Sequence, residues 1–408
     1  KGWEDVSYFI PVPKGADYLE VMPFLMQAAA GTLDFAKFDV LTAPKSKLPI
    51  PHSENPLKPS PVMTPKDLTG LPPALRVKGN KIFNDKGEEV WLQGLCLDSM
   101  EWSAGGEHIL ESVKVAIDDW KANCIRLPIT DEFWAGRNKW QRDDGMGYRK
   151  LVDAAVAATV SRGAYMIIDL HRFHAPTVTH VEFWKDVATR YKNHPGVVFE
   201  LFNEPHGLSW KVWRDGGSLS GKDNKSNDIG LAENDAKADK DYCVGMQALL
   251  DAVRSVGADN PVIVGGLDWS YDLSGVASGE WPLKDAKGRG IVYSSHIYPW
   301  KHGWQEAFVS ALDKYPVFIG ETGNIRAWED FSFIPVGARG EKVGVGSQWP
   351  IDMLGLIQSR KIHWTGFSFH PKCGPQVLKD WTYAPTDFWG VHVKDALAGK
   401  KFEMKSMR

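Results

Sequence analysis

Two glutamates end two strongly apolar segments of the sequence. Glu204 stands in VVFELFNEP, residues 197–205, and Glu321 stands in PVFIGETG, residues 316–323. A carboxylate at the end of an apolar strand contributes nothing to packing, so both side chains are candidates for chemistry. Two carboxyl groups that flank one bond can cleave it, because one protonates the leaving oxygen while the other attacks carbon or activates water.

Most of the other apolar segments also end in polar or aromatic side chains. Arg126 lies in CIRLPI, His171 ends YMIIDLH, and Asn203 directly precedes Glu204. The remaining residues of this kind are Asp98, Asp268, Trp269, His296, Tyr298 and His370. A lone strand-end glutamate more often forms an ion pair with a loop arginine, but two of them with such neighbours favour a shared site.

Eight short apolar segments rich in β-branched and aromatic residues predict the scaffold. They cover residues 90–99, 124–129, 165–171, 197–205, 261–269, 291–299, 316–323 and 363–371. Stretches with helical period separate them, for example 108–122, 148–163 and 181–194. Parallel strands need helical crossovers, so eight such units predict an α/β fold, the (β/α)8 TIM barrel. The C-terminal strand ends build the active site there, and strands four and seven face one another.

The sequence before the barrel divides into two parts. Residues 1–43 read as a few strands separated by Gly, Pro and Asp, and they resemble the tail of a jelly-roll sugar-binding module. Residues 44–75 are rich in proline and lack apolar periodicity, which predicts an extended linker. The catalytic barrel is therefore expected over residues 76–408. The first part is too short to close a sandwich alone, so we expect it to pack against the barrel or a partner.

Composition narrows the class of partner. The chain of 408 residues has 48 Lys and Arg against 51 Asp and Glu, a net charge of -3 that gives no case for nucleic acid or an anionic membrane. The 18 tryptophans favour carbohydrate, because the C–H faces of sugar rings stack on indole. We expect a monomer that acts on a polysaccharide or oligosaccharide.

The ends of the chain and its hydropathy bear on location. No apolar run approaches the length of a membrane span, so no membrane-spanning segment is expected. The sequence begins Lys1-Gly2 without Met or an apolar leader, and we expect any export signal to lie upstream of it. The protein is therefore predicted to be secreted or periplasmic.

Metal and disulfide chemistry find little support. The four cysteines show no CxxC spacing and are expected to be mostly buried free thiols. His171 and His174 are three residues apart in DLHRFH, but no carboxylate-rich pattern accompanies them. The sequence predicts no metal site and no cofactor.

The motifs together resemble glycoside hydrolase family 5, the cellulase and mannanase family of (β/α)8 retaining enzymes. The resemblance covers residues 76 to 398 and rests on IRLP, DLH, NEP, HIYP and GETG, which follow one another in the family's order. Asn-Glu-Pro after an apolar strand is a specific signal, whereas DLH alone is weak.

The resemblance assigns roles to the matching residues. It makes Glu204 the general acid/base and Glu321 the nucleophile of a double displacement. Glu321 should be ionised, helped by Arg126 and Tyr298, while the pKa of Glu204 should be raised. Asn203 would hydrogen-bond the sugar 2-hydroxyl. His171 and His296 would orient hydroxyls or carboxylates.

Aromatic side chains near the strand ends are candidate sugar platforms. Trp102, Trp134 and Trp269 are predicted to bind substrate. The family usually presents Trp on the eighth strand, where this chain aligns Phe367 instead, so the cleavage site offers less stacking area. Glu200 shares the strand face of Glu204 but lies deeper, which predicts a buried, hydrogen-bonded core residue.

The sequence thus predicts a retaining glycoside hydrolase, an endo-β-1,4-glucanase. A β-mannanase, or an exo-acting glycosidase or furanosidase of the same family, is the alternative within the fold. A carbohydrate-binding barrel without catalysis is the alternative from another class, and the intact glutamate pair argues against it.

Overall fold

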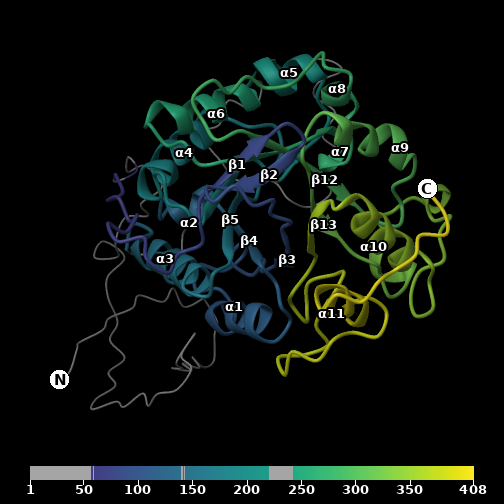
Figure 1. Cartoon of the computed structure of the whole chain (residues 1–408). Coiled ribbons are helices and arrows are strands. Elements are labelled where there is room, and N and C mark those ends of the chain that lie inside the picture. Colours follow the sequence, from purple (N-terminus) through teal and green to yellow (C-terminus); the bar gives the residue numbers. More distant parts are fainter. Residues whose placement is uncertain (1–56, 58, 139–140, 142, 220–241) are drawn as a thin grey trace, which may run out of the picture.

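A computed structural model describes residues 57, 59–138, 141, 143–219 and 242–408. The predicted β-rich segment 1–43 and most of the polar insert after the fourth strand lie outside the described residues. Figure 1 shows the helices arranged around a central set of strands.

Eight parallel strands form a closed barrel in the order β11-β12-β13-β14-β3-β4-β5-β7. They are β3 (Gln93–Cys96), β4 (Cys124–Ile129), β5 (Tyr165–Leu170), β7 (Val197–Glu200), β11 (Val262–Gly265), β12 (Ile291–Ile297), β13 (Val317–Thr322) and β14 (His363–Gly366). Each predicted apolar segment contributes one strand, which confirms the (β/α)8 fold. The barrel strands end before most of the polar residues, so these side chains stand at the mouth.

Helices of very different length connect the strands. The longer ones are α1 (Ile109–Asp118), α3 (Met146–Val160), α4 (Val178–Arg190), α6 (Met246–Ser255), α10 (Trp349–Arg360) and α11 (Gly390–Leu397). The shorter ones are α2 (Asp131–Trp134), α5 (Trp210–Asp215), α7 (Leu267–Ser270), α8 (Ser274–Ala277), α9 (Trp304–Ala307), η4 (Val309–Asp313), η5 (Trp328–Phe331) and η6 (Val336–Ala338). The first three predicted helices correspond to α1, α3 and α4.

A hairpin that the sequence reasoning missed covers the bottom of the barrel. Strands β1 (Leu75–Lys78) and β2 (Lys81–Asn84) pair antiparallel. Leu75 and Ile82 pack with residues from the starts of the barrel strands, such as Phe318, in one buried cluster. The barrel is thereby closed at its N-terminal end, and the mouth at the other end is left for the site.

The described end of the proline-rich stretch lies against α4. The Ser60 hydroxyl donates to Asp186, and the backbone N–H of Met63 donates to the carbonyl of Arg190. Two pairs of very short strands complete the structure, namely β6 (Phe173–His174) with β8 (Glu204–Pro205), and β9 (Gly217–Ser218) with β10 (Tyr242–Cys243).

Candidate active site

Glu204 stands beyond the barrel strand that leads to it. The sequence reasoning took residues 197–205 as one strand, but β7 ends at Glu200 and the chain continues into β8. The backbone N–H of Asn203 donates to the Leu170 carbonyl, and that of Glu204 donates to the Arg172 carbonyl. This pairing keeps the chain extended and places Glu204 over the barrel mouth.

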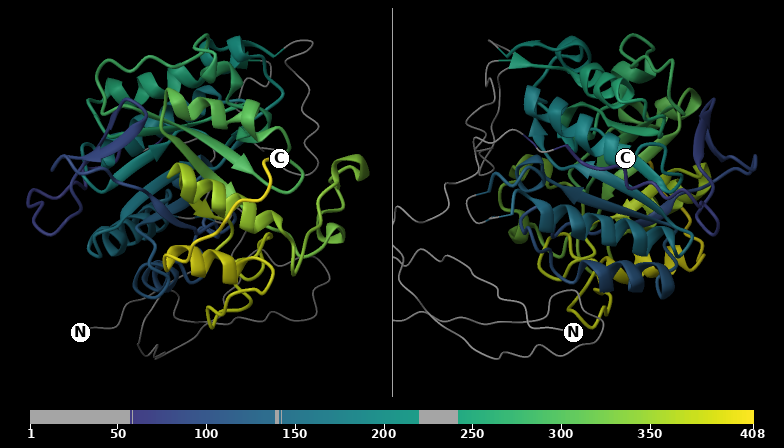
Figure 2. Two further views of the ribbon diagram at one scale, coloured as in Figure 1. Left: turned by 45° about the vertical axis from the view of Figure 1, so that its right-hand side comes forward. Right: turned by 90° about the vertical axis from the view of Figure 1, so that its left-hand side faces the viewer.

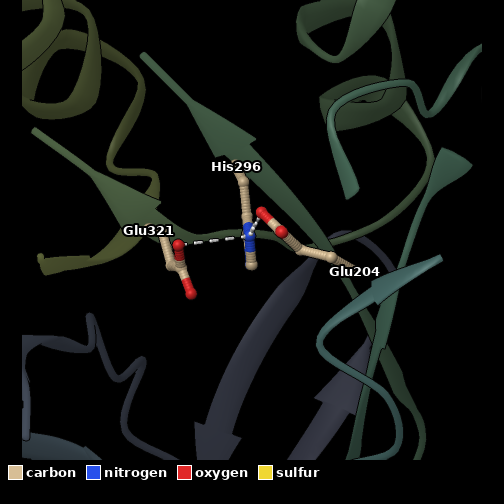
Figure 3. A group of neighbouring side chains, drawn as sticks. All are labelled: Glu204, His296 and Glu321. Carbon is tan, nitrogen blue, oxygen red and sulfur yellow. Dashed lines mark hydrogen bonds and ion pairs between the residues drawn. The ribbon is translucent and has the colours of Figure 1, made fainter. Parts of the chain in front are cut away.

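Three side chains from three strands meet at the centre of the mouth (Figure 3). Nδ1 of His296 lies 2.9 Å from Oε1 of Glu204 and 3.6 Å from Oε2 of Glu321. One ring nitrogen of His296 and one carboxyl oxygen of each glutamate all lie within 4.8 Å of one another. The two carboxyl groups predicted from the sequence are therefore brought together, with an imidazole between them.

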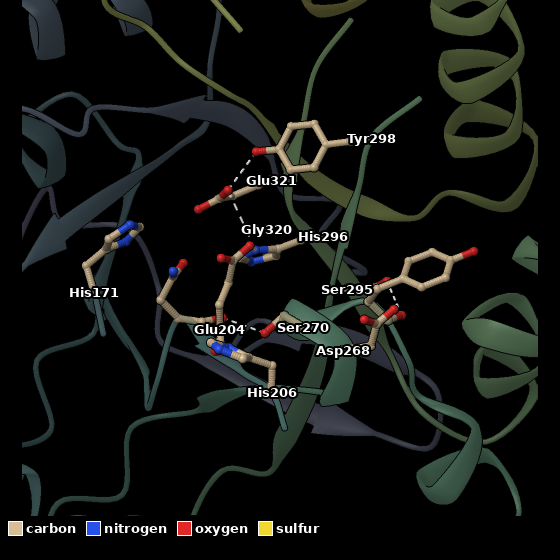
Figure 4. Close-up of polar contacts among 12 residues, drawn as sticks. His171, Glu204, His206, Asp268, Ser270, Ser295, His296, Tyr298, Gly320 and Glu321 are labelled. Carbon is tan, nitrogen blue, oxygen red and sulfur yellow. Dashed lines mark hydrogen bonds and ion pairs between the residues drawn. The ribbon is translucent and has the colours of Figure 1, made fainter. Parts of the chain in front are cut away.

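Glu321 is held by two donors. Nη1 of Arg126 lies 2.9 Å from Oε1, and the hydroxyl of Tyr298 donates to Oε2 over 2.7 Å. Figure 4 shows the tyrosine ring on the opposite side of Glu321 from Glu204. A carboxylate bonded to a guanidinium and a phenol is fixed in place and is stabilised in its charged form.

Arg126 connects that carboxylate to the inside of the barrel. Its Nε donates to Glu200 over 2.6 Å, and its Nη2 donates to Oδ1 of Asn203 over 2.8 Å and lies 3.0 Å from Asp169. Glu200 is fully buried and hydrogen-bonded, as predicted. It belongs to the support of the site, because its bond to Nε sets the plane of the guanidinium.

His171 is fixed by carboxylates on both ring nitrogens. Nδ1 lies 2.6 Å from Asp169, and Nε2 lies 3.5 Å from Glu101. His174 makes a separate contact, in which its Nδ1 lies 2.9 Å from the His206 carbonyl. The two histidines of DLHRFH thus face different partners.

Gly320 leaves room for the imidazole. A Cβ at this position would lie 2.9 Å from Nε2 of His296 and 2.7 Å from the hydroxyl of Ser294. Real Cβ atoms do not approach polar atoms so closely, so His296 reaches the two glutamates because its neighbour on β13 has no side chain.

The two glutamates differ in how strongly their surroundings favour protonation. Burial raises the pKa of both, since a charged carboxylate loses its hydration. The negative charge of Glu321 raises the pKa of Glu204 further, well above its ordinary value. The rise at Glu321 is opposed by the charge of Arg126 and the Tyr298 hydrogen bond. The surroundings therefore favour a proton on Glu204 more strongly than on Glu321.

The pKa values of the side chains around the two glutamates are shifted as well. Burial raises the pKa of Asp169 and of Glu200 to about 7, against the lowering effect of Arg126. Burial and the charge of Arg126 lower the pKa of His296 well below its ordinary value, so its ring is neutral. A neutral imidazole can donate one hydrogen bond and accept another without placing a positive charge between the glutamates.

The tryptophans that were predicted to bind substrate differ in how far they are exposed. Trp269 is partly exposed and stacks on His206, with ring centroids 3.5 Å apart, and it lines an open pocket of about 580 Å³ together with His206 and Trp210. Trp102 is 42% exposed and packs edge-on against His370. Both positions are open to a ligand.

The prediction that Trp134 binds substrate is wrong. Its side chain is fully buried, its indole N–H donates to Asp186, and it packs against Phe183, so it cannot stack on a sugar. A tryptophan near a strand end was a misleading sign of a sugar platform, because many of the tryptophans in this protein fill the core. Eight tryptophans are fully buried in the described residues: Trp120, Trp134, Trp184, Trp213, Trp304, Trp349, Trp364 and Trp389.

Phe367 follows β14 and keeps 8% of its surface exposed. Its carbonyl accepts a hydrogen bond from the Trp389 indole. Trp364, three residues earlier, is buried. Phe367 therefore offers little free ring area to a ligand.

The central cluster has the donor types and spacing that can also hold a divalent cation. If the two glutamates act instead as acid and nucleophile, no metal is needed. Dialysis of the protein against EDTA should then leave its hydrolytic activity unchanged. Activity that disappears after chelation and returns with added Zn²⁺ or Mn²⁺ would show that the cluster works as a metal centre.

Arg126→Lys tests the electrostatic support of Glu321. Lysine keeps one charge but cannot bond Glu200, Asn203 and Glu321 together. Since Arg126 lowers the pKa of Glu321, loss of the guanidinium raises that pKa, and more of Glu321 is protonated at low pH. We expect kcat/KM to fall about 10- to 100-fold, with the acidic limb of its pH profile moved to higher pH. A pH profile of unchanged shape would contradict this role.

Comparisons with known proteins agree with this geometry. The family model described as Cellulase (glycosyl hydrolase family 5) matches residues 83–373. The chain belongs to this family. The match spans the strands that carry Arg126, His171, Glu204, His296 and Glu321.

Several relatives of the chain are named endoglucanases. Endoglucanase Z of Dickeya dadantii (strain 3937) is 27% identical over 263 residues, which are 62% of this chain and 52% of the relative. An endoglucanase of Paenibacillus polymyxa is 26% identical over 372 residues, covering 75% of this chain and 82% of the relative. The chain thus spans about half the length of the first of these relatives.

A solved structure shares the fold. Beta-glucanase SdGluc5_26A from Saccharophagus degradans, in complex with cellotetraose, superposes with a TM-score of 0.63. The two sequences are 23% identical, and the alignment covers 85% of this chain and 99% of the other. In the part of the chain that the structure describes, no helix is long and apolar enough to cross a membrane.

Several residues of the site were missed in the sequence. Asp169 joins Arg126 to His171, and Glu101 faces the other side of that ring. A signal for Asp169 was available, because residues two apart on a strand share a face and an acid within YMIIDLH has no role in packing. Glu101 lies in a loop after β3. In a loop, the spacing of residues in the sequence does not indicate in which direction a side chain points.

Proposed function

We propose that this protein is a retaining endo-β-1,4-glucanase in which Glu204 is the acid/base and Glu321 the nucleophile. The observation that carries the mechanism is the spacing of the two carboxyl groups. One carboxyl oxygen of Glu204 lies within 4.8 Å of one carboxyl oxygen of Glu321. Retaining enzymes keep their two carboxyl groups roughly 5 Å apart, whereas inverting enzymes need roughly 6.5 Å or more to fit a water molecule.

In the first step Glu321 attacks the anomeric carbon while the proton of Glu204 moves to the glycosidic oxygen. The C–O bond to the leaving sugar breaks, and a glycosyl ester with Glu321 forms. In the second step Glu204, now ionised, takes a proton from water, the water oxygen attacks the anomeric carbon, and Glu321 leaves. Two inversions give net retention.

The surroundings of Asn203 support its predicted role toward the sugar. Its Oδ1 accepts from Arg126, and its backbone carbonyl accepts from the Ser270 hydroxyl. Its Nδ2 is buried and has no hydrogen-bond partner among the described residues. An amide fixed in this way beside the glutamates offers its N–H groups to the 2-hydroxyl, a contact that strengthens in the transition state.

The choice of an endo-acting glucanase rests on two observations. The relatives from Dickeya dadantii and Paenibacillus polymyxa carry the name endoglucanase, and two partly exposed tryptophans follow different barrel strands, Trp102 after β3 and Trp269 on α7 after β11. Binding surfaces beyond more than one strand suit a chain that passes through the site. A β-mannanase is the second candidate, because Phe367 offers less stacking area than the usual tryptophan.

The substrate also bears on location and assembly. A polysaccharide does not cross a membrane, so we place the protein outside the cytoplasm, as a secreted or periplasmic enzyme. The net charge of -3 suits a neutral polymer and not nucleic acid. We expect a monomer, since one chain contributes every residue of the proposed site.

A substrate panel tests the proposal. The protein is incubated with carboxymethylcellulose, β-mannan, xylan and aryl glycosides of cellobiose, mannobiose and arabinofuranose, and reducing ends and products are measured. We expect a fast fall in the viscosity of carboxymethylcellulose and release of aryl alcohol from the cellobioside. Cleavage of mannan alone would replace the glucanase by a mannanase, and no cleavage in the panel would refute the enzyme.

A further inference from the structure

The loop between β13 and α10 presents apolar side chains to solvent on the side of the barrel mouth. Phe333 is 61% exposed, Val336 is 80% exposed and Val345 is 62% exposed. These are three of the eleven large hydrophobic residues that are exposed in the described part of the chain. In the left view of Figure 2 this loop stands out from the barrel as a yellow-green arm. Exposed apolar groups gathered on one segment indicate a contact surface.

The loop is held in a fixed shape. The Trp328 indole donates to the Glu341 carbonyl, and the guanidinium of Arg339 donates to the carbonyls of Ile334 and Ser332. The backbone N–H of Gly344 donates to the Ile325 carbonyl. Hydrogen bonds that close the loop on itself leave its exposed side chains presented in one arrangement, which lowers the entropy cost of binding.

Ring contacts connect this surface to the nucleophile. Tyr298, which bonds Glu321, stacks on Trp300 with ring centroids 4.8 Å apart. Trp300 contacts Phe331 at 5.6 Å, and Phe331 contacts Phe333 at 5.7 Å. The exposed phenyl ring is thus the outer end of a series of ring contacts that starts at Tyr298 beside Glu321.

The charges of the loop suit a neutral ligand. Between residues 326 and 347 there are three basic and three acidic side chains, so the local net charge is zero. Arg326 pairs with Asp330, and Glu341 pairs with Arg408. A nucleic acid or an acidic protein would meet no excess of opposite charge here, while the C–H faces of glucose rings match aromatic and aliphatic side chains.

We infer that Phe333, with Val336 and Val345, forms an accessory surface that contacts a β-glucan chain beyond the catalytic cleft. The inference rests on the proposed glucanase function and adds a site that acts on long chains only. A short soluble substrate ends before it reaches this surface. The surface therefore affects binding to insoluble or polymeric glucan and leaves the chemistry at Glu204 and Glu321 untouched.

The double variant Phe333→Ser/Val336→Ser tests the surface, with Val62→Ser as a control. Val62 has a similar exposure of 58% but lies in the proline-rich stretch that runs along α4, away from the mouth. We expect adsorption to phosphoric-acid-swollen cellulose to weaken about three- to tenfold in the double variant. Hydrolysis of an aryl cellobioside should stay within about twofold of wild type, and the control should match wild type in both assays.

Other outcomes separate the possible explanations. Equal adsorption of the double variant and wild type would refute the surface while leaving the glucanase in place. A wild type that cleaves no glucan would refute the proposed function itself. A fall in Tm of several degrees, or dissociation of a wild-type dimer by the double variant, would mean that the chain or a second copy covers these residues, and the inference would be wrong.

Discussion

Replacement of Glu321 by glycine is expected to reduce kcat by on the order of 10⁴-fold or more, because no covalent intermediate can form without the carboxylate. The change removes a side chain with only 6% exposure and leaves space beside Arg126 and Tyr298. Azide added at molar concentration should enter this space and attack the anomeric carbon directly. One displacement instead of two gives an α-glycosyl azide.

This outcome separates a nucleophile from a supporting carboxylate. The assay uses dinitrophenyl β-cellobioside and identifies the azide adduct by NMR. Glu306→Gln, at an exposed glutamate on α9, is the control and should match wild type. A Glu321→Gly variant that keeps more than about a tenth of the activity, or that forms a β-azide, would rule out the assigned role.

Replacement of Glu204 by alanine is expected to have an effect that depends on the leaving group. For polymeric glucan, whose leaving sugar needs a proton, kcat/KM should fall about 10²- to 10⁴-fold. For dinitrophenyl β-cellobioside, whose leaving group departs without a proton, formation of the glycosyl ester should continue. Hydrolysis of that ester then limits turnover, and azide should accelerate it and give a β-glycosyl azide.

The pH dependence provides a second test of the same residue. Wild-type kcat/KM should rise with pH as Glu321 ionises and fall at higher pH as Glu204 loses its proton. The pKa of Glu204 is raised well above its ordinary value by burial and by the neighbouring Glu321, so the falling limb should lie far above pH 4.5. With the dinitrophenyl substrate, Glu204→Ala should lack the falling limb. A limb that persists would assign it to another group.

Much of the barrel and its central pair could be predicted because both depend on local patterns. Glu204 and Glu321 follow apolar segments whose order defines the strands, and the C-terminal ends of the eight parallel strands meet at one mouth, where β7 and β13 are separated by β11 and β12. The sequence also indicated the partners of Glu321, since Arg126 and Tyr298 stand at neighbouring strand ends.

What could not be predicted depends on contacts between distant segments. Trp134 reads like a strand-end platform, but its burial is decided by α4, which supplies Asp186. The hairpin at Leu75 has short strands next to a proline-rich stretch and becomes visible only through its packing on the barrel floor. The exposed arm around Phe333 has no periodic pattern, and its direction comes from hydrogen bonds within the loop.

The stereochemistry of the first product tests the central claim most directly. Proton NMR during hydrolysis of cellotetraose by wild-type protein distinguishes the anomer released before mutarotation. Double displacement by Glu321 and Glu204 predicts that the β-anomer appears first and the α-anomer grows in later. An α-anomer as the first product would mean a single displacement by water, and it would contradict the covalent role of Glu321.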